Sequence, residues 1–146
     1  MGAALAVTQA FPAPEAPTID GSDSEPAWSK ATVITGFRMF QPVEDGDPHF
    51  RTEAKAIYDS GNLYVFVRAY DPHRDSIIGL LSRRDVKTQS DQIKLMVDSY
   101  HDRQTGYEFA VNPVGVKRDY YTYDHSQEDA SWDAGWGVGT SIDSPG

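Results

Sequence analysis

The clearest structural signal in the chain is the run Leu63-Tyr64-Val65-Phe66-Val67-Arg68-Ala69-Tyr70. It is rich in β-branched and aromatic residues, which favour strands. Leu63, Val65, Val67 and Ala69 would share one face of such a strand, and the opposite face also carries apolar side chains. We therefore expect a strand in the middle of a sheet, buried on both faces.

The segments on either side of this run alternate in the same way. A strand over residues 51–58 precedes it, and the turn Asp59-Ser60-Gly61-Asn62 joins the two. Further strands are predicted over residues 92–98, 107–111 and 116–123, with turns at 102–106 and 112–115. Short loops require antiparallel pairing, and a strand with one apolar face must bury it against another layer. The sequence therefore predicts an all-β fold, an antiparallel β-sandwich, with one short helix over residues 75–81.

Both ends of the chain depart from this pattern. Residues 1–10 are small and apolar, they lead into a proline-rich stretch over 11–17, and no basic residue precedes Lys30. We interpret residues 1–17 as a signal-peptide remnant or a flexible leader outside the fold, and assign 18–146 to one domain. At the other end, residues 135–142 begin another strand and Asp143-Ser144-Pro145 resembles a turn into more chain. We therefore expect an incomplete sandwich, since a missing hairpin would expose a sheet edge.

Composition excludes several classes of function. The chain has 146 residues, no cysteine and a formal net charge of −9, so disulfides and thiolate chemistry are excluded and nucleic acid is a poor partner. No run approaches the roughly 20 apolar residues of a membrane span. There is no G-x-S-x-G motif, and the four histidines are isolated in polar loops. We expect no enzyme, although a pair of facing carboxylates for glycoside hydrolysis would be visible only in space.

Several short motifs occur in a characteristic order. They are Ile19-Asp20-Gly21 with Glu25 and Trp28, Leu63-Tyr64-Val65 in the strand that ends at Asp71, and Ser90-Asp91-Gln92-Ile93 leading to Asp98. Over residues 17–142 this order resembles family 9 carbohydrate-binding modules. Residues 100–107 and 111–116, with Arg83-Arg84-Asp85 and the stretch 131–136, are similar to a subgroup. In that subgroup the module stands at the N-terminus of exported bacterial proteins, ahead of a predicted outer-membrane barrel.

The resemblance implies a β-sandwich, sugar binding and often bound Ca²⁺. It also implies a periplasmic or cell-surface location and further domains in a larger exported or outer-membrane protein of carbohydrate catabolism. In characterised members two tryptophans clamp the sugar, helped by charged and amide side chains. Such a clamp is physically sound, since sugar C–H faces stack on aromatic rings and planar polar groups bind the hydroxyls.

Trp132 and Trp136 are the first candidates for ligand binding. Four positions apart on an extended chain, they would share a face and form an aromatic platform, with Asp133 nearby. The alternative is that one or both pack against a sheet, because tryptophans are usually largely buried. Trp28 is expected to be a core residue for the same reason.

The other candidates are polar. Arg83, Arg84 and Asp85 lie in one loop, where the arginines would fork onto ligand hydroxyls or carboxylates; the alternative is a surface ion pair of Arg84 with Asp85 or Asp91. Asn112 and Asp119 are further ligand-binding candidates. For calcium, Asp20, Asp23 and Glu25 form the densest oxygen cluster outside a strand, but they do not match the twelve-residue calcium loop.

Three functions remain open at this stage. The first is a non-catalytic carbohydrate-binding module that holds a glycan by aromatic stacking and hydrogen bonds. The second is a structural or protein-interaction domain of an outer-membrane protein, and the third is a glycoside hydrolase.

Overall fold

The computed structural model describes residues 8–124 and 127–143, and it divides the chain into two compact units. Of the described residues, 8–74 form the first unit, and 75–124 with 127–143 form the second. The two units are described in turn. Part of the leader (residues 1–7), His125 and most of the C-terminal turn lie outside the described residues.

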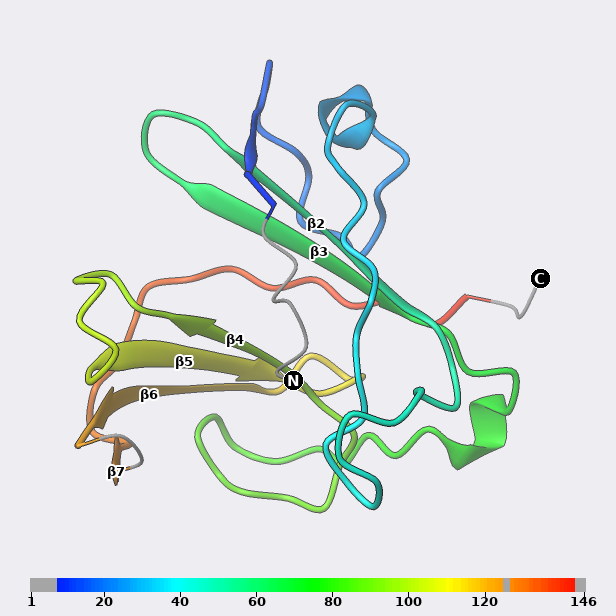
Figure 1. Ribbon diagram of the computed structural model, residues 1–146, viewed down its shortest axis with the longest axis vertical. Helices are drawn as coiled ribbons and strands as arrows, with labels where there is room; N and C mark the ends of the chain where they lie inside the picture. The colour runs from blue at the N-terminus through cyan, green and yellow to red at the C-terminus, as the bar shows by residue number, and fades with distance from the viewer. Residues whose placement is uncertain (1–7, 125–126, 144–146) are drawn as a thin grey trace. The chain divides into compact units, whose positions relative to one another are not determined.

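The first unit is built on one sheet of three strands in the order β1-β2-β3 (Figure 1). They are β1 (Phe11–Pro12), β2 (Thr52–Tyr58) and β3 (Leu63–Ala69). Strands β2 and β3 form an antiparallel hairpin. Its turn is the predicted one, because the Asp59 carboxylate accepts hydrogen bonds from the backbone N–H groups of Gly61 and Asn62, at 2.9 and 2.8 Å.

Strand β1 corrects the leader prediction. Phe11 pairs in parallel with Ile57, the Ala13 N–H donates to the Tyr58 carbonyl at 2.8 Å, and the side chains of Phe11 and Ala13 pack against the core. The prediction that residues 1–17 lie outside the fold is therefore wrong for 11–13, and one strand pair is not antiparallel. The proline-rich composition misled the prediction, although proline is compatible with an edge strand, where its missing N–H is not needed.

Strand β3 corrects a second expectation. Within the described residues it pairs only with β2, so β2 is the central strand of this sheet. Leu63 keeps 54 % of its surface exposed. Apolar side chains on both faces of a strand therefore do not show that both faces are buried. They also do not show that the strand is central, because composition does not reveal which strands pair along its two edges.

The core of the first unit lies on one face of this sheet. Ala27, Trp28, Ala31 and Ile57 are buried together there. Trp28 ends the 3₁₀ turn η1 (Pro26–Trp28), and its ring lies 5.9 Å from that of Phe66. Trp28 is therefore a core residue, as predicted.

The second unit is a four-stranded antiparallel meander, β4-β5-β6-β7 (Figure 1). Its strands are β4 (Ile93–Val97), β5 (Gly106–Val111), β6 (Lys117–Tyr123) and β7 (Gln127–Asp129), and only β7 was not predicted. The turn between β5 and β6 is closed by a hydrogen bond from the Gly115 N–H to the Asn112 carbonyl. Gly115 has a φ of +84°, which glycine adopts without steric cost.

Two local predictions fail near the ends of this unit. Instead of a short helix over residues 75–81 there is a single 3₁₀ turn, η2 (Arg74–Ser76). Residues 135–142 form no strand; the chain there is held by side chains of β6, as described below.

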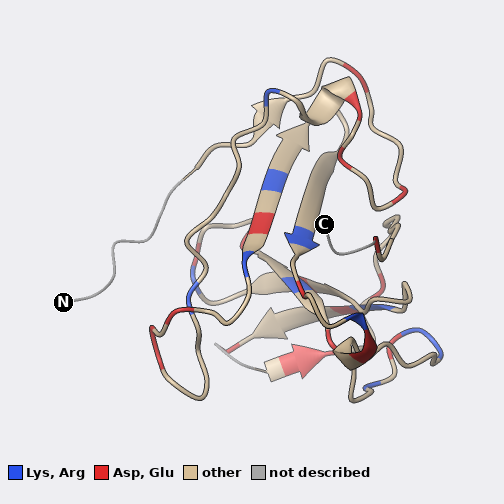
Figure 2. Ribbon diagram, turned by 90° about the vertical axis from the view of Figure 1, so that its right-hand side faces the viewer, with Lys and Arg blue, Asp and Glu red and all other residues tan. Residues whose placement is uncertain are grey.

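The all-β prediction is confirmed. The described residues form two sheets and only two single-turn 3₁₀ segments, which is consistent with a β-sandwich. Acidic residues are spread over loops and strands, with Lys and Arg between them (Figure 2). No helix in the described residues is long and apolar enough to cross a membrane.

Candidate functional site

Aromatic rings line one face of the sheet in the second unit. Side chains alternate along a strand, so Tyr107 and Phe109 of β5 share a face, and the pairing of Tyr107 with Tyr121 places Tyr121 and Tyr123 of β6 on it too. The ring centroids of Tyr107 and Tyr121 are 5.5 Å apart, and those of Tyr121 and Tyr123 are 6.2 Å apart and nearly parallel. These spacings are typical of favourable aromatic pairs.

Trp132 and Trp136 lie on this same aromatic face. The Trp132 ring is 4.6 Å from that of Tyr107, and the Trp136 ring meets that of Phe109 edge-on at 5.3 Å. Both tryptophans are half-buried. They therefore pack against the sheet, as one alternative held, and still present part of their rings.

The two tryptophans differ in how firmly they are held. The Trp136 indole N–H donates to Asp119 at 3.2 Å, and its carbonyl accepts a hydrogen bond from the Lys117 ammonium at 2.7 Å. The same ammonium lies 5.4 Å from the Trp136 ring centroid. Trp132 makes ring contacts to Tyr107 and Phe109, and its side chain has no hydrogen bond to any residue that the structure describes. Trp136 is therefore held more firmly than Trp132.

Further tyrosines continue the aromatic surface from Tyr107, the ring on which Trp132 packs. Tyr100, in the loop after β4, is 72 % exposed, and Tyr123 is also exposed. Burial, with Tyr100 and Tyr121 close by, raises the pKa of Tyr107. We call Tyr100, Tyr107, Tyr121, Tyr123 and Trp132 the tyrosine–tryptophan cluster. Sequence reasoning missed its tyrosines, although the hairpin register of β5 and β6 would have placed Tyr107 opposite Tyr121.

A buried carboxylate fixes the segment that carries the tryptophans. Asp119 of β6 is fully buried, and its Oδ2 accepts hydrogen bonds from the Arg84 guanidinium and the Ala134 N–H, both at 2.8 Å, as well as from Trp136. The three donors come from two separate loops. Asp119 thereby fastens both loops to the sheet.

Asp85 and Asp133 complete this arrangement, which we call the Asp119 hub (Arg84, Asp85, Asp119 and Asp133). Asp85 has a left-handed backbone (φ +65°), which aspartate tolerates better than most residues, and its Oδ1 accepts from the Asp119 N–H at 3.1 Å. Arg84 lies 3.5 Å from Asp85 and 2.5 Å from Asp133. One guanidinium thus contacts three carboxylates.

The electrostatics of the hub favour ionised carboxylates. Burial alone would raise the pKa of Asp119, but the hydrogen bonds from Ala134 and Arg84 outweigh it, so this pKa lies below its ordinary value. Oxygens of Asp85, Asp119 and Asp133 lie within 4.8 Å of one another, the one such group of potential metal ligands found in the described residues. Arg84 already supplies positive charge at this position.

Comparison with protein families identifies the chain. Residues 19–141 match the family described as carbohydrate family 9 binding domain-like. The chain belongs to this family. Comparisons with curated proteins and with solved structures give no match. Membership supports carbohydrate binding in general, and domains of this family are typically non-catalytic; the outer-membrane subgroup stays a prediction.

In this carbohydrate family 9 binding domain-like chain, three of the predicted polar residues converge. Arg84, Asp85 and Asp119 meet in the hub beside the tryptophans, and the predicted alternative of an Arg84–Asp85 ion pair is present at 3.5 Å. Arg83 is exposed, and no hydrogen bond or ion pair of its side chain is found in the described part of the chain. The Asp91 carboxylate accepts from the Ile78 N–H.

Asn112 lies apart from the hub and has a structural task. Its side-chain N–H₂ donates to the Leu80 carbonyl at 2.8 Å, and its Oδ1 accepts from the N–H groups of Val114 and Val116. These bonds hold the turn between β5 and β6, so the side chain is committed to the backbone.

The residues predicted to hold calcium do not converge either. Asp23 pairs with Lys55 at 2.7 Å, whose hydrogen bond lowers the pKa of Asp23. Both carboxylate oxygens of Glu25 accept from the Thr18 N–H, and Asp20 caps its own turn through the Ser22 N–H. As arranged, these residues do not fit a shared Ca²⁺ ion, and calcium binding stays a prediction.

Proposed function

We propose that this domain binds a glycan on the tyrosine–tryptophan cluster, with Trp132 as the main stacking ring. The observation that carries the proposal is the packing of Trp132 on Tyr107, 4.6 Å between centroids, while Trp132 stays partly exposed and Tyr100 and Tyr123 of the same cluster are exposed. Such rings offer flat apolar surface to the C–H face of a sugar, and phenol hydroxyls at their edges offer hydrogen bonds.

The Asp119 hub supports this function in two ways. It holds the segment that carries Trp132 and Trp136 against the sheet, so that little side-chain and loop entropy is lost on binding. It also places the Asp133 carboxylate, 69 % exposed, next to Trp132 as an acceptor for sugar hydroxyls.

The proposal extends to the protein around the domain. We infer that the domain is a non-catalytic accessory of a larger exported or outer-membrane protein that acts in carbohydrate catabolism, with further domains, at the periplasm or cell surface. The family and the half-exposed aromatics support the binding part. Cell fractionation of the natural protein tests the location, and recovery in the cytosol would contradict it.

Substitution of Trp132 tests the site. Trp132→Ala is expected to weaken binding of neutral β-linked oligosaccharides, such as cellotetraose and xylotetraose, by about tenfold or more, the usual effect of truncating an aromatic anchor. Binding is measured by calorimetry, and circular dichroism confirms that the variant is folded.

Phe40→Ala is the matched control, because it removes an exposed aromatic ring from the first unit. It should leave the affinity unchanged. Equal binding by the wild type and a folded Trp132→Ala variant would refute the site. A protein partner captured through the cluster, without any glycan signal, would favour the interaction-domain alternative.

A further inference from the structure

A polar groove lies on the face of the β4–β7 sheet opposite the aromatic rings. It has a volume of about 320 Å³ and is lined by residues of the 86–92 segment and of β4, β6 and β7, among them Lys87, Gln92, Lys94, Arg118 and Glu128. The register places Lys94 and Arg118 on either side of Ala110 of β5, on the face away from Tyr107 and Phe109. All of these residues belong to the second unit.

Arg118 is the unusual residue of this groove. It is only 9 % exposed, and its Nε is buried without a hydrogen-bond partner. No carboxylate or carbonyl of the described residues pairs with its guanidinium, whose central carbon lies 4.9 Å from the Tyr120 ring. Burying a charged group without a counter-charge is unfavourable, so a missing partner is expected.

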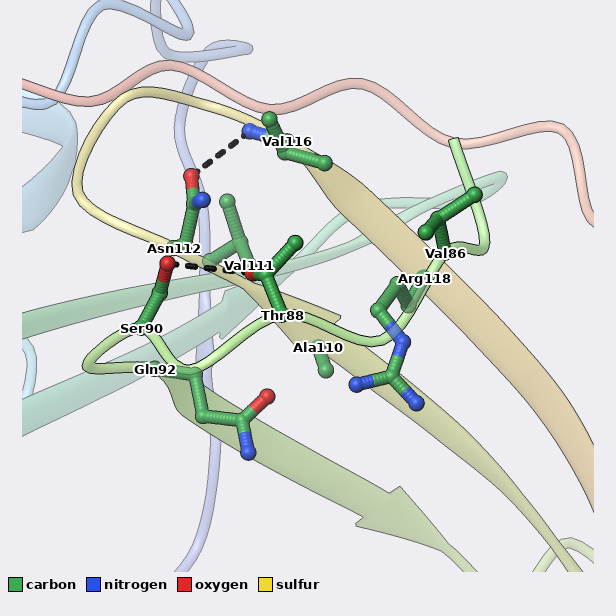
Figure 3. A pocket seen from close by; sticks show the side chains of 9 residues that line it. All are labelled: Val86, Thr88, Ser90, Gln92, Ala110, Val111, Asn112, Val116 and Arg118. Carbon is green, nitrogen blue, oxygen red and sulfur yellow. Dashed lines mark hydrogen bonds between the residues drawn. The ribbon is translucent and has the colours of Figure 1, made fainter. Parts of the chain in front are cut away.

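The open end of the guanidinium faces the groove. Figure 3 shows the smaller recess next to the groove, with which it shares Thr88, Gln92 and Arg118. There the Arg118 guanidinium and the Gln92 amide extend to the same side of the 86–92 segment, away from Asn112. A charged fork and an amide are therefore both available to one ligand.

The other charges of the groove are already compensated. The Lys94 ammonium lies 2.8 Å from Glu108, an ion pair without hydrogen-bond alignment, and the Lys87 ammonium lies 3.6 Å from Glu128. Arg118 is left as the cation without an anion. The chain has a net charge of −9, so its long-range field repels anions. The groove is a local positive site, where an anion would be held by direct contact and not by long-range attraction.

We propose that this groove is a second ligand site, which binds a carboxylate-bearing saccharide, that is, a uronic acid residue. A carboxylate matches the planar guanidinium of Arg118 with paired, charge-assisted hydrogen bonds. The amides of Gln89 and Gln92 and the hydroxyl of Thr88, all in the lining, would bind sugar hydroxyls. The volume is that of a small-molecule pocket. The carboxylate part rests on Arg118, and the saccharide part rests on the proposed function.

Titration of the full chain with D-glucuronate tests this inference, with glucose and acetate as the neutral and the sugar-free probes. We expect saturable binding of glucuronate by calorimetry, and binding of glucose and acetate weaker by about tenfold or more, since each lacks one half of the recognised group. Acetate binding as tight as glucuronate would overturn the saccharide part. Glucose binding as tight would overturn the carboxylate part.

Arg118→Leu should weaken glucuronate binding by about tenfold or more and should raise the thermal midpoint, because it removes a buried charge without a partner. The matched control is Arg103→Gln, which removes the same charge from an exposed loop of the same unit and should change neither quantity. Gln92→Ala, at the exposed rim, should weaken binding without unfolding the unit. Unchanged glucuronate affinity in a folded Arg118→Leu variant would overturn the proposal.

The binding experiments distinguish a failure of the groove proposal from a failure of the cluster proposal. Glucuronate binding that depends on Arg118 while neutral oligosaccharides do not bind would refute the cluster and support the groove. Glucuronate binding that depends on Trp132 and not on Arg118 would refute the groove and leave the cluster in place.

Discussion

The two units of this chain bury different kinds of residue. In the first, the buried hydrophobic side chains are Ala27, Trp28, Ala31, Ala54 and Ile57, and no polar side chain of its described residues is buried with them. In the second, four polar or charged side chains are buried among the described residues, and only two hydrophobic ones accompany them. The polar set is Glu108, Asn112, Arg118 and Asp119.

We interpret this difference as a division between a structural first unit and a ligand-binding second unit. An apolar core stabilises a unit without further requirement, whereas each buried polar group is unfavourable unless a partner satisfies it. In the second unit Asn112 is satisfied by the backbone, and Oδ2 of Asp119 by two loops, while Asp119 Oδ1 has no hydrogen-bond partner among the described residues. Arg118 has no such partner in the described part of the chain. We place both ligand sites in this second unit, which contains the buried polar and charged side chains.

The largest expected effect is at Asp119. Asp119→Ala removes the acceptor of three hydrogen bonds and leaves Arg84 with only Asp85 and Asp133, so we expect the free energy of unfolding to fall by about 3–5 kcal/mol. Urea denaturation followed by near-ultraviolet circular dichroism measures it. The control is Asp133→Ala, whose carboxylate is mostly exposed, with an expected cost below about 1 kcal/mol. Equal costs for the two variants would break the comparison.

The first unit supplies the converse prediction. Ile57→Ala empties part of its apolar core and should cost about 2–5 kcal/mol. Below its melting temperature this variant should still bind oligosaccharides and glucuronate like the wild type, because no ligand contact is proposed there. Val65→Ala, at a 39 % exposed position on the face of the same sheet opposite Ile57, is the control and should cost about 1 kcal/mol or less. Loss of glycan binding in folded Ile57→Ala would show that the first unit is more than a scaffold.

Strand periodicity was sufficient to predict most of this fold. The alternation in residues 51–70 and 92–123 predicted strands β2 to β6 and the turns of their hairpins, because period-two patterns and turn residues are local signals. It did not reveal β1, because a two-residue edge strand within a proline-rich stretch has no pattern of its own. It also placed β3 in the middle of a sheet, because pairing partners are a non-local property.

The residues of the candidate site could be chosen from the sequence more readily than their arrangement in space could be predicted. Arg84, Asp85, Asp119, Trp132 and Trp136 were chosen from residue type and family resemblance. The structure joins all of them except Trp132 by direct contacts, and Trp132 lies on the same aromatic face as Trp136. That one buried oxygen of Asp119 joins Arg84 and Trp136 depends on the register of β6 with two distant loops. The unpaired state of Arg118 was equally invisible, since burial and the absence of a partner exist only in the folded chain.

The smallest expected effect is the pH dependence of stability that arises from Asp119. The folded-state pKa of Asp119 is lowered below its ordinary value of about 3.8, so its ionised form stabilises the unit at every pH above that value. This contribution is lost as the pH falls through the lower, folded-state pKa.

Asp119→Asn keeps the shape and one acceptor but cannot ionise, so it should be less stable than the wild type at neutral pH. The difference between the two should shrink as the pH falls below about 3.8. Urea midpoints between pH 6 and pH 2.5 measure it, and the other acidic groups with lowered pKa values, Asp23, Asp59, Asp102 and Asp129, act equally in both proteins. A constant difference across this range would mean that the hydrogen-bond geometry at Asp119, rather than its charge, joins the two loops to the sheet.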